Sequence, residues 1–171
     1  LIKVITDEDI VGWGEAHHGR CPGAIAKLID TTLKELIVGM DPLDNIGIWE
    51  KVYKMQLSSH GMGYASTMAL SGLDIALWDI KGKYFNAPVF KLLGGANKKI
   101  PAYAGGIALG WQDPSSLSEE ALHYISIGYK AIKLRVGDTI DNDFERVKKV
   151  RDSIPEGIEV LVDANTNYTL K

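Results

Sequence analysis

The sequence predicts a small α+β domain over residues 1–97, followed over residues 98–171 by the first three βα units of a (β/α)8 TIM-type barrel. In the first part, two strand-like segments precede a run of helices, a grouping typical of α+β domains. In the second part, strands and amphipathic helices alternate, and such βαβ units build parallel sheets. Polar residues follow two of these apolar strands, at the strand ends where ligands bind in parallel α/β folds.

The first domain is expected to begin with a hairpin. Residues 1–6 and 10–15 have strand composition, and an acidic turn joins them. A polar loop follows, with Pro22 placed to open a helix and Gly39 placed to end it. This loop contains His17, His18 and Arg20.

Three further helices are expected in the first domain, over residues 43–55, 64–84 and 87–95, with a break at Gly61-Met-Gly63. The 64–84 segment is the most apolar element, so we expect a buried helix. Asp74 and Asp79 within it are interpreted as structural hydrogen-bond or ion-pair partners.

The second domain is expected to place strands at 100–104, 129–137 and 158–163. A helix starts at Asp113, with Ser116 and Glu119 at capping-box spacing, and ends near Gly128. A second helix is indicated by apolar residues at three- or four-residue steps, namely Ile140, Phe144, Val147, Val150 and Ile154.

The length of the alternating part favours an incomplete barrel. Three parallel strands leave two open edges, whereas a closed barrel needs about 250 residues. We therefore expect a piece of a longer protein, with one strand absent before Leu1 and five βα units absent after Lys171. An open doubly wound sheet is the alternative, but the chain contains neither G-x-G-x-x-G nor G-x-x-x-x-G-K-[ST], so nucleotide binding has weak support.

Composition is that of an ordinary globular protein, with 46% apolar and 24% charged residues. A net charge of -3 gives no reason to expect binding to nucleic acid or to an acidic membrane. The single cysteine forms no disulfide framework, and no apolar run approaches the length of a membrane span. We expect a cytoplasmic protein.

The residues at the strand ends are the candidates for chemistry. Lys133 and Arg135 share one face of their strand, and Asp163 and Asn165 would share a face of the next strand if the chain stayed extended. A fixed arginine beside a lysine is expected to lower the lysine pKa toward the range useful for proton transfer. Asp163 is a candidate Mg²⁺ ligand, although an Asp after a strand is also a common helix N-cap. The alternative is that Lys133 and Arg135 are simply a solvated pair on an edge strand.

Together these groups suit one kind of chemistry. Mg²⁺ and fixed cations stabilise the enediolate that forms when the proton next to a substrate carboxylate is removed. His17, His18 and Arg20 are either surface polar residues or part of a loop that contacts the ligand.

Several motifs occur in a specific order along the chain. By these motifs it resembles the mandelate racemase/muconate lactonizing enzyme family of the enolase superfamily, in its mandelate racemase branch, over essentially all residues. The motifs are Gly12-Trp-Gly-Glu15, Gly72-Leu-Asp-Ile-Ala-Leu-Trp-Asp-Ile-Lys-Gly-Lys83, Leu92-Leu-Gly-Gly95, Lys133-x-Arg135 and Val162-Asp-Ala-Asn165.

The resemblance implies an α+β capping domain over a modified (β/α)8 barrel. It implies that Lys133 and Arg135 occupy a catalytic Lys-x-Lys position at the end of the second barrel strand. Asp163 would be the first of three acidic Mg²⁺ ligands, and Asn165 would lie near the substrate carboxylate. The other two ligands and a His-Asp dyad would lie beyond Lys171.

The resemblance also implies that residues 17–21 form a capping-domain loop closing over the substrate, with His17, His18 and Arg20 as substrate-binding residues. Arg135 departs from the many members that have a lysine base there.

The expected activity is Mg²⁺-dependent removal of a proton α to a carboxylate, with dehydration of a sugar acid as the expected reaction. Arg135 and the polar His/Arg loop support this narrowing. A racemase, epimerase or cycloisomerase is the close alternative, and a non-catalytic homologue is the alternative of another class. We expect a small-molecule carboxylate partner, a homo-oligomer, and no activity from the 171-residue chain alone.

Overall fold

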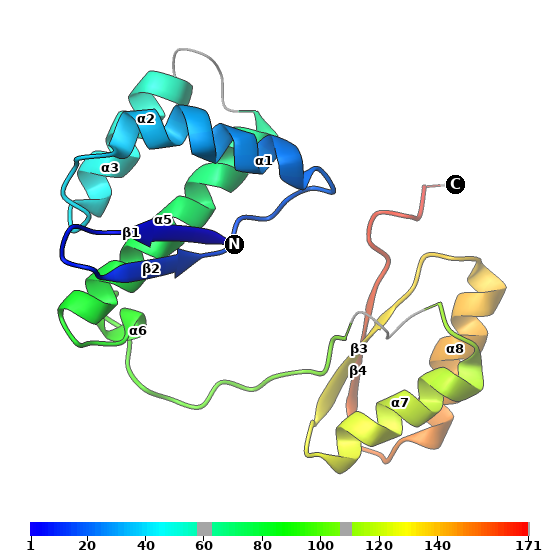
Figure 1. Cartoon of the computed structure of the whole chain (residues 1–171). Helices are drawn as coiled ribbons and strands as arrows, with labels where there is room; N and C mark the ends of the chain where they lie inside the picture. Colours follow the sequence, from blue (N-terminus) through cyan, green and yellow to red (C-terminus); the bar gives the residue numbers. More distant parts are fainter. Residues whose placement is uncertain (58–62, 107–110, 171) are drawn as a thin grey trace. The chain divides into compact units, whose positions relative to one another are not determined.

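A computed structural model of the chain describes residues 1–57, 63–106 and 111–170. The chain forms two compact units, Leu1–Lys98 and Lys99–Lys171, and each is described by itself (Figure 1). Most of the expected break at Gly61-Met-Gly63 lies outside the described residues.

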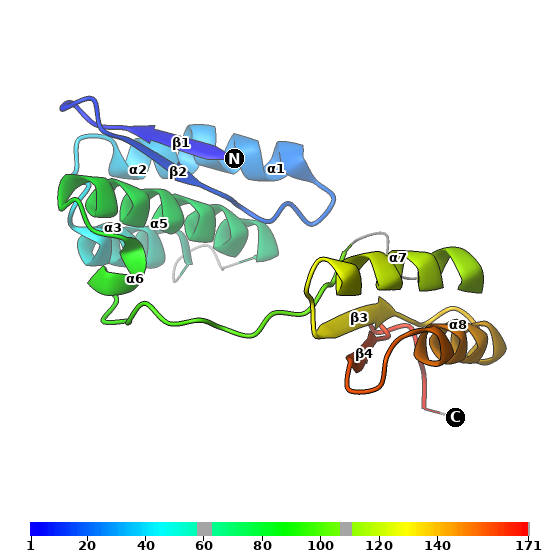
Figure 2. The same cartoon turned by 90° about the horizontal axis from the view of Figure 1, so that it is seen from below.

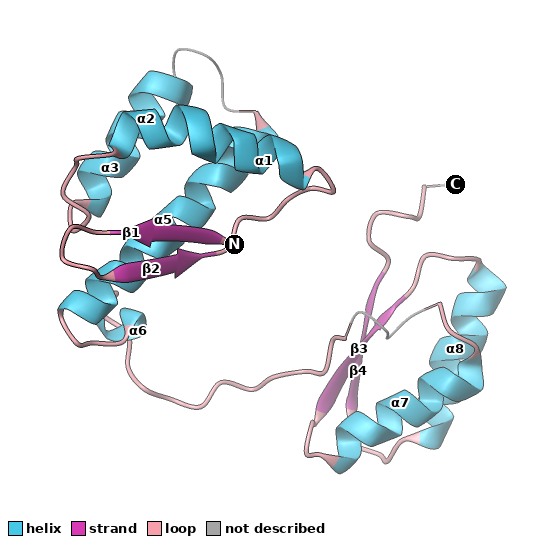
Figure 3. Cartoon of the chain, in the orientation of Figure 1, coloured by secondary structure: helices cyan, strands magenta, loops and turns pink. Residues whose placement is uncertain are grey.

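The first unit is an antiparallel hairpin packed on helices (Figure 3). Strand β1 (Ile2–Ile5) pairs with β2 (Val11–Gly14), which confirms the predicted hairpin. The predicted 64–84 helix is confirmed as α5 (Tyr64–Tyr84). The remaining helices are α1 (Pro22–Leu28), α2 (Lys34–Ile37), α3 (Asn45–Val52) and α6 (Val89–Leu92), with π-helical stretches at Ile29–Leu33 and Tyr53–Leu57.

Helix α5 is the centre of the core of the first unit. Its Leu70, Leu73, Leu77 and Ile80 are buried, together with side chains of α1, α3 and the first π-helical stretch. Strand β2 lies directly on the helix backbone, because a Cβ added at Gly12 would lie 2.2 Å from the Ala76 carbonyl oxygen.

Asp79 has the structural role predicted for it. Its Oδ2 accepts hydrogen bonds from the Trp13 backbone N at 2.8 Å and from Lys83 Nζ at 2.6 Å. Lys83 Nζ also donates to the Val11 carbonyl at 2.7 Å, so the pair joins α5 to β2. Burial opposes ionisation of Asp79, but the hydrogen bonds from Lys83 and Trp13 outweigh it and lower its pKa. Burial instead raises the pKa of Asp74.

We expect Gly14→Ala to lower the free energy of unfolding of the first unit by about 3 kcal/mol, the upper range for overpacking. A Cβ at Gly14 would lie 1.9 Å from the Gly72 carbonyl oxygen, where rigid helix backbone cannot yield. Gly23→Ala on α1 is the matched control, since nothing lies within 4 Å of its added Cβ. Chemical denaturation should show the control unchanged or slightly more stable. Equal effects of the two substitutions would contradict this account.

The second unit contains α7 (Pro114–Ser126), β3 (Ala131–Arg135), α8 (Ile140–Ser153) and β4 (Glu159–Asp163). Strands β3 and β4 are parallel, with Ala131 opposite Glu159 and Arg135 opposite Asp163. The predicted β-α-β unit is confirmed here. Helix α7 starts where expected, but the predicted capping box is wrong: Asp113, directly before Pro114, accepts hydrogen bonds from the Ser115 and Ser116 amides and is the N-cap.

The strand predicted at residues 100–104 is reduced to a single parallel bridge between Ala104 and Ile132. Two hydrogen bonds support the bridge, from Ala104 N to Ala131 O and from Lys133 N to Ala104 O. Pro101 lacks an N–H group, and in the described chain the segment has a neighbour on one side only. The full strand prediction is therefore wrong for this chain.

Helices α7 and α8 pack against each other and against one face of the strand pair (Figures 1 and 2). The shared core contains Leu117, Ala121, Ile132, Leu134 and Val150, all almost fully buried. Side chains alternate along a strand, so Lys133 and Arg135 lie on the opposite face from Ile132 and Leu134. No helix in the described residues is long and apolar enough to cross a membrane.

Candidate functional site

The parallel register brings two of the predicted site residues together. Lys133 on β3 and Asp163 at the end of β4 form an ion pair, with 2.8 Å between Lys133 Nζ and Asp163 Oδ2. Arg135 lies directly opposite Asp163 in the register, and the Val136 amide donates to the Asp163 carbonyl at 3.0 Å. Both charged groups of the pair are about one-third exposed, so they remain accessible to a ligand.

The ion pair decides the protonation of both partners. The hydrogen bond from Lys133 lowers the pKa of Asp163, and the Asn165 amide and the charges of Lys133 and Arg135 act in the same direction. The hydrogen bond to Asp163 raises the pKa of Lys133. The prediction that Arg135 would lower this pKa is wrong here, because a carboxylate at 2.8 Å outweighs an exposed guanidinium on the same strand. Lys133 is therefore a cation at neutral pH.

Asn165 does not continue the strand, so it does not share a strand face with Asp163 as an extended chain would require. Strand β4 ends at Asp163, and Asn165 has a φ of 49°. Its backbone N donates to Asp163 Oδ1 at 2.9 Å, which makes a tight local turn. No helix follows within the described residues, so Asp163 is not the helix N-cap that was its structural alternative.

Tyr103 lines the candidate site and was not among the residues predicted from the sequence. Lys133 Nζ lies 5.7 Å from the centroid of its ring, and both line a hollow of about 60 Å³ with Arg135 and Asp163. Gly105 allows this, because a Cβ there would lie 2.8 Å from the Tyr103 ring. The available signal was its place beside Ala104, at the end of the first predicted strand of the alternating part.

His17, His18 and Arg20 belong to the first unit, in the loop between β2 and α1. All three are exposed. The two imidazole rings stack, with centroids 5.7 Å apart and planes 7° from parallel. His17 Nδ1 accepts from the Gly19 amide at 3.2 Å, and His18 Nδ1 accepts from the Arg20 amide at 3.0 Å. In a neutral imidazole with Nδ1 as acceptor, Nε2 carries the proton and is the donor available to a ligand.

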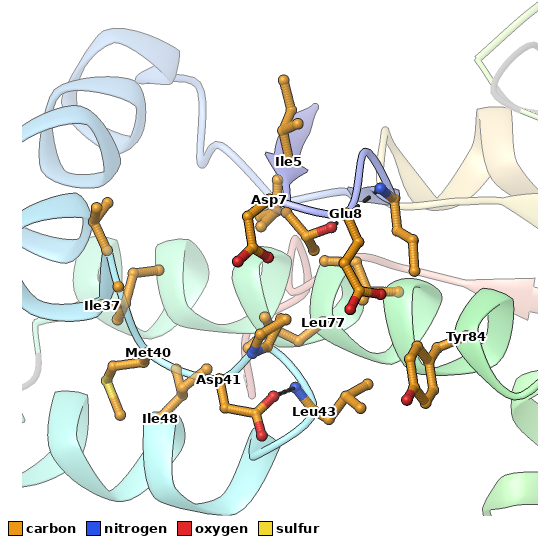
Figure 4. Close-up of a pocket in the computed structure, with 17 residues that line it drawn as sticks. Ile5, Asp7, Glu8, Ile37, Met40, Asp41, Leu43, Ile48, Leu77 and Tyr84 are labelled. Carbon is orange, nitrogen blue, oxygen red and sulfur yellow. Dashed lines mark hydrogen bonds between the residues drawn. The ribbon is translucent and has the colours of Figure 1, made fainter.

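A larger pocket of the first unit, about 610 Å³, lies at the other end of the hairpin from this loop. Figure 4 shows it between the β1–β2 turn, the segment around Met40 and helix α5. Ile5, Ile37, Leu77 and other apolar residues form much of its wall, beside Asp7, Glu8 and Asp41. None of the predicted site residues lines it, so pocket size alone does not indicate the chemistry.

The donor set at the strand ends suits a hard divalent cation but is incomplete. A carboxylate oxygen is the type of ligand that Mg²⁺ prefers, and Asp163 supplies one. Within the described ranges, no group of three or more His, Cys, Asp or Glu side chains is arranged to hold a metal ion. Asp163 would thus hold Mg²⁺ only together with ligands from elsewhere.

Comparison with known families identifies the chain. Residues 1–94 match the mandelate racemase/muconate lactonizing enzyme N-terminal domain, and residues 116–171 match the enolase C-terminal domain-like family. The chain therefore belongs to the mandelate racemase/muconate lactonizing enzyme family of the enolase superfamily, which confirms the predicted resemblance.

Curated relatives include dehydratases and cycloisomerases. The arabinonate dehydratase of Saccharolobus solfataricus is 36% identical, over 99% of this chain and 46% of its own length. The D-galactarolactone cycloisomerase of Agrobacterium fabrum is 32% identical, over 99% of this chain and 45% of its own length. The chain spans about half the length of these relatives.

Solved structures agree with the fold. A member of the enolase superfamily from Polaromonas sp. JS666 is 54% identical with a TM-score of 0.91, covering 98% of this chain and 44% of that one. A racemase from Streptomyces coelicolor A3(2) is 30% identical with a TM-score of 0.87, covering 98% of this chain and 50% of that one. The latter structure contains bound magnesium.

Proposed function

We propose that this chain is part of a Mg²⁺-dependent enzyme that removes the proton α to a carboxylate, and that the reaction is the dehydration of a sugar acid. The observation that carries the proposal is the Lys133–Asp163 pair at the carboxyl ends of two parallel strands, with Arg135 opposite Asp163. The family membership and the dehydratase among its relatives support it.

The second unit is proposed to supply the first three strands of a (β/α)8 barrel, with Leu1–Lys98 as its capping domain. The packing of α7 and α8 on one strand face supports a barrel over a doubly wound sheet, because a barrel keeps its helices outside. The chain spans about half of its relatives. We propose that the other metal ligands and the base lie outside residues 1–171, and that the 171-residue chain alone is inactive.

Each candidate site residue of the second unit has a proposed role. Asp163 would hold the metal, which supplies Lewis-acid stabilisation of negative charge on the substrate carboxylate. Lys133 and Arg135 act as a cationic clamp on the same carboxylate: the contact with Asp163 raises the pKa of Lys133, and a guanidinium is a fixed cation. Asn165 is proposed to lie near that carboxylate as well.

The dehydration needs a single base on one face of the α carbon. The base takes the α proton, the β hydroxyl leaves with a proton as water, and the resulting enol becomes a 2-keto acid. Because Lys133 is held as an ammonium, it is better suited to stabilise the charge that develops than to take the proton. The stacked His17 and His18 with Arg20 are proposed to bind the hydroxyl groups of the sugar acid.

The proposed function is tested by incubating the full-length enzyme with Mg²⁺ and a panel of sugar acids in D₂O. For the best substrate, we expect water loss or α-deuterium exchange from one α-epimer only, because one base acts on one face. A mass shift detected by mass spectrometry, together with assay of the 2-keto product, gives both readings.

The cycloisomerase among the relatives motivates the second candidate, a racemase or isomerase of the same family. A racemase or epimerase predicts comparable deuterium incorporation from both epimers, lost on Lys133→Ala, whereas a cycloisomerase predicts an isomeric product formed without loss of water. Either outcome would replace the dehydratase proposal. No turnover of any carboxylic acid by the Mg²⁺-loaded full-length protein would contradict both.

A further inference from the structure

A buried carboxylate lies behind the two strand ends. Asp143, in the first turn of α8, has 5% of its surface exposed. Its Oδ2 accepts hydrogen bonds from the Gly137 amide at 2.7 Å, the Asp138 amide at 3.0 Å and the Tyr168 hydroxyl at 2.6 Å. Gly137 and Asp138 belong to the loop that leaves β3, and Tyr168 belongs to the segment that follows β4. One carboxylate oxygen therefore connects the loops that continue from Arg135 and from Asp163.

Two further side chains reinforce this connection. Arg146 Nη1 lies 3.2 Å from Asp143 Oδ1 and 2.9 Å from Asp138 Oδ2. Asn167 Nδ2 donates to the Gly137 carbonyl at 3.1 Å. Every oxygen of the buried carboxylate thus has a donor, which is the condition for keeping a charge inside a protein.

The two loops also touch directly through Gly137. Its φ is 109°, a conformation that favours glycine, and a Cβ there would lie 2.7 Å from the Ala164 carbonyl oxygen. Ala164 is the neighbour of Asp163 in the chain. A small displacement of the β3 loop would therefore be passed to the backbone beside the proposed metal ligand.

The charge state of Asp143 suits this arrangement. Burial opposes its ionisation, but the hydrogen bonds from Tyr168, Gly137, Asp138 and Arg146 outweigh burial and lower its pKa. The same contact raises the pKa of Tyr168, so the phenol remains a donor at neutral pH.

We infer that Asp143, through Tyr168, is a positioning residue for the proposed active site: it holds the Asp163 loop at the distance from β3 that the metal ligand and the Lys133 clamp require. This inference rests on the proposed function. It concerns side chains whose hydrogen bonds join the two loops to each other, and it assigns the tyrosine hydroxyl a role in metal affinity rather than in the chemistry.

The decisive variant is Tyr168→Phe in the full-length protein. It removes the bond to Asp143 while the amides of the β3 loop and Arg146 still satisfy the carboxylate, and Tyr168 is 51% exposed, so the fold should persist. We expect the Kd for Mg²⁺, measured by calorimetry without substrate, to rise about tenfold, at the lower end of effects of residues that orient metal ligands. Amide hydrogen exchange at Asn167, whose N donates to Ala164 O, should accelerate in the metal-free protein.

Asp143→Asn should show the same two effects more strongly, and Asp141→Asn is the matched control. Asp141 is also an acidic residue in the first turn of α8, but it is exposed. A rise in the Mg²⁺ Kd shared by Asp141→Asn would indicate a general effect of charge at the helix start and would overturn the inference.

Asp163→Asn separates this inference from the proposed function. If Asp163→Asn leaves Mg²⁺ binding unchanged, the proposed metal site itself fails. If Asp163→Asn weakens Mg²⁺ binding while Tyr168→Phe changes neither the Kd nor the hydrogen exchange, the proposed function stands and the positioning role is wrong. A lower Tm of Tyr168→Phe with an unchanged Mg²⁺ Kd would likewise show that the Tyr168–Asp143 hydrogen bond stabilises the fold and does not position the metal ligand.

Discussion

Replacement of Lys133 by methionine is expected to lower kcat of the full-length enzyme by about 10²- to 10³-fold, the usual cost of removing a preorganised charge from a site where charge develops. Lys133→Met keeps most of the length of the side chain and removes the ammonium that lies 2.8 Å from Asp163. The Mg²⁺ affinity should hold or increase, because a positive charge next to the ligand is lost. Steady-state kinetics and calorimetry on the same preparation check both parts.

Lys130→Met is the control for this substitution. Lys130 is exposed and directly precedes β3, so the change in net charge and side-chain length is the same without the contact to Asp163. Loss of kcat in both variants would show that total charge matters rather than this pair. A kcat of Lys133→Met within a few-fold of the parent would contradict the clamp.

The pH dependence of stability follows from the same pair. The hydrogen bond from Lys133 lowers the pKa of Asp163 in the folded protein, so this stabilisation is present above the ordinary aspartate range and is lost as the pH falls below about 4. The raised pKa of Lys133 acts in the opposite range: its stabilisation is present below the ordinary lysine pKa and is lost as the pH rises through the raised value. Lys133→Met should remove both contributions.

Asp163→Asn is expected to weaken Mg²⁺ binding by at least about 10²-fold and to lower activity with it. Hard cations prefer charged oxygen ligands, and even residues outside the ligand set cost 10- to 100-fold in metal affinity when changed. The fold should persist, because the amide oxygen of asparagine can still accept from the Asn165 amide. Calorimetry with Mg²⁺ and a circular dichroism melt measure the two properties separately.

Glu159→Gln is the matched control for the proposed metal ligand. Glu159 is exposed and lies four residues earlier on the same strand. The substitution therefore removes one carboxylate from β4 without changing the strand end. If calorimetry shows the same Mg²⁺ affinity for Asp163→Asn and the parent, Asp163 is not a metal ligand.

The sequence by itself determined the local elements and the candidate strand ends. The apolar composition of residues 64–84 predicted the buried helix α5, Pro22 predicted the start of α1, and the acidic turn predicted the hairpin. These features depend on interactions between residues close in the chain, which a sequence pattern records. Lys133 and Asp163 could be placed at the same sheet edge in advance, because parallel strands of one βαβ unit end at the same edge.

Tertiary structure alone decided the electrostatics of the pair. The pKa of Lys133 depends on whether a carboxylate or a guanidinium is nearer, and the register with β4 places the carboxylate at 2.8 Å. The position of Lys133 over the ring of Tyr103, a residue 30 positions earlier in the chain, was likewise decided by tertiary contacts.

The buried Asp143 shows the same limit most clearly. In the sequence it is one of several acidic residues near the start of a helix, and nothing in the spacing separates it from the exposed Asp141. Only folding brings Gly137 and Tyr168, 31 residues apart in the chain, onto one carboxylate oxygen. Contacts between segments that are distant in sequence leave no periodic pattern. The role of Asp143 could therefore be recognised only from its burial and hydrogen bonds in the folded chain.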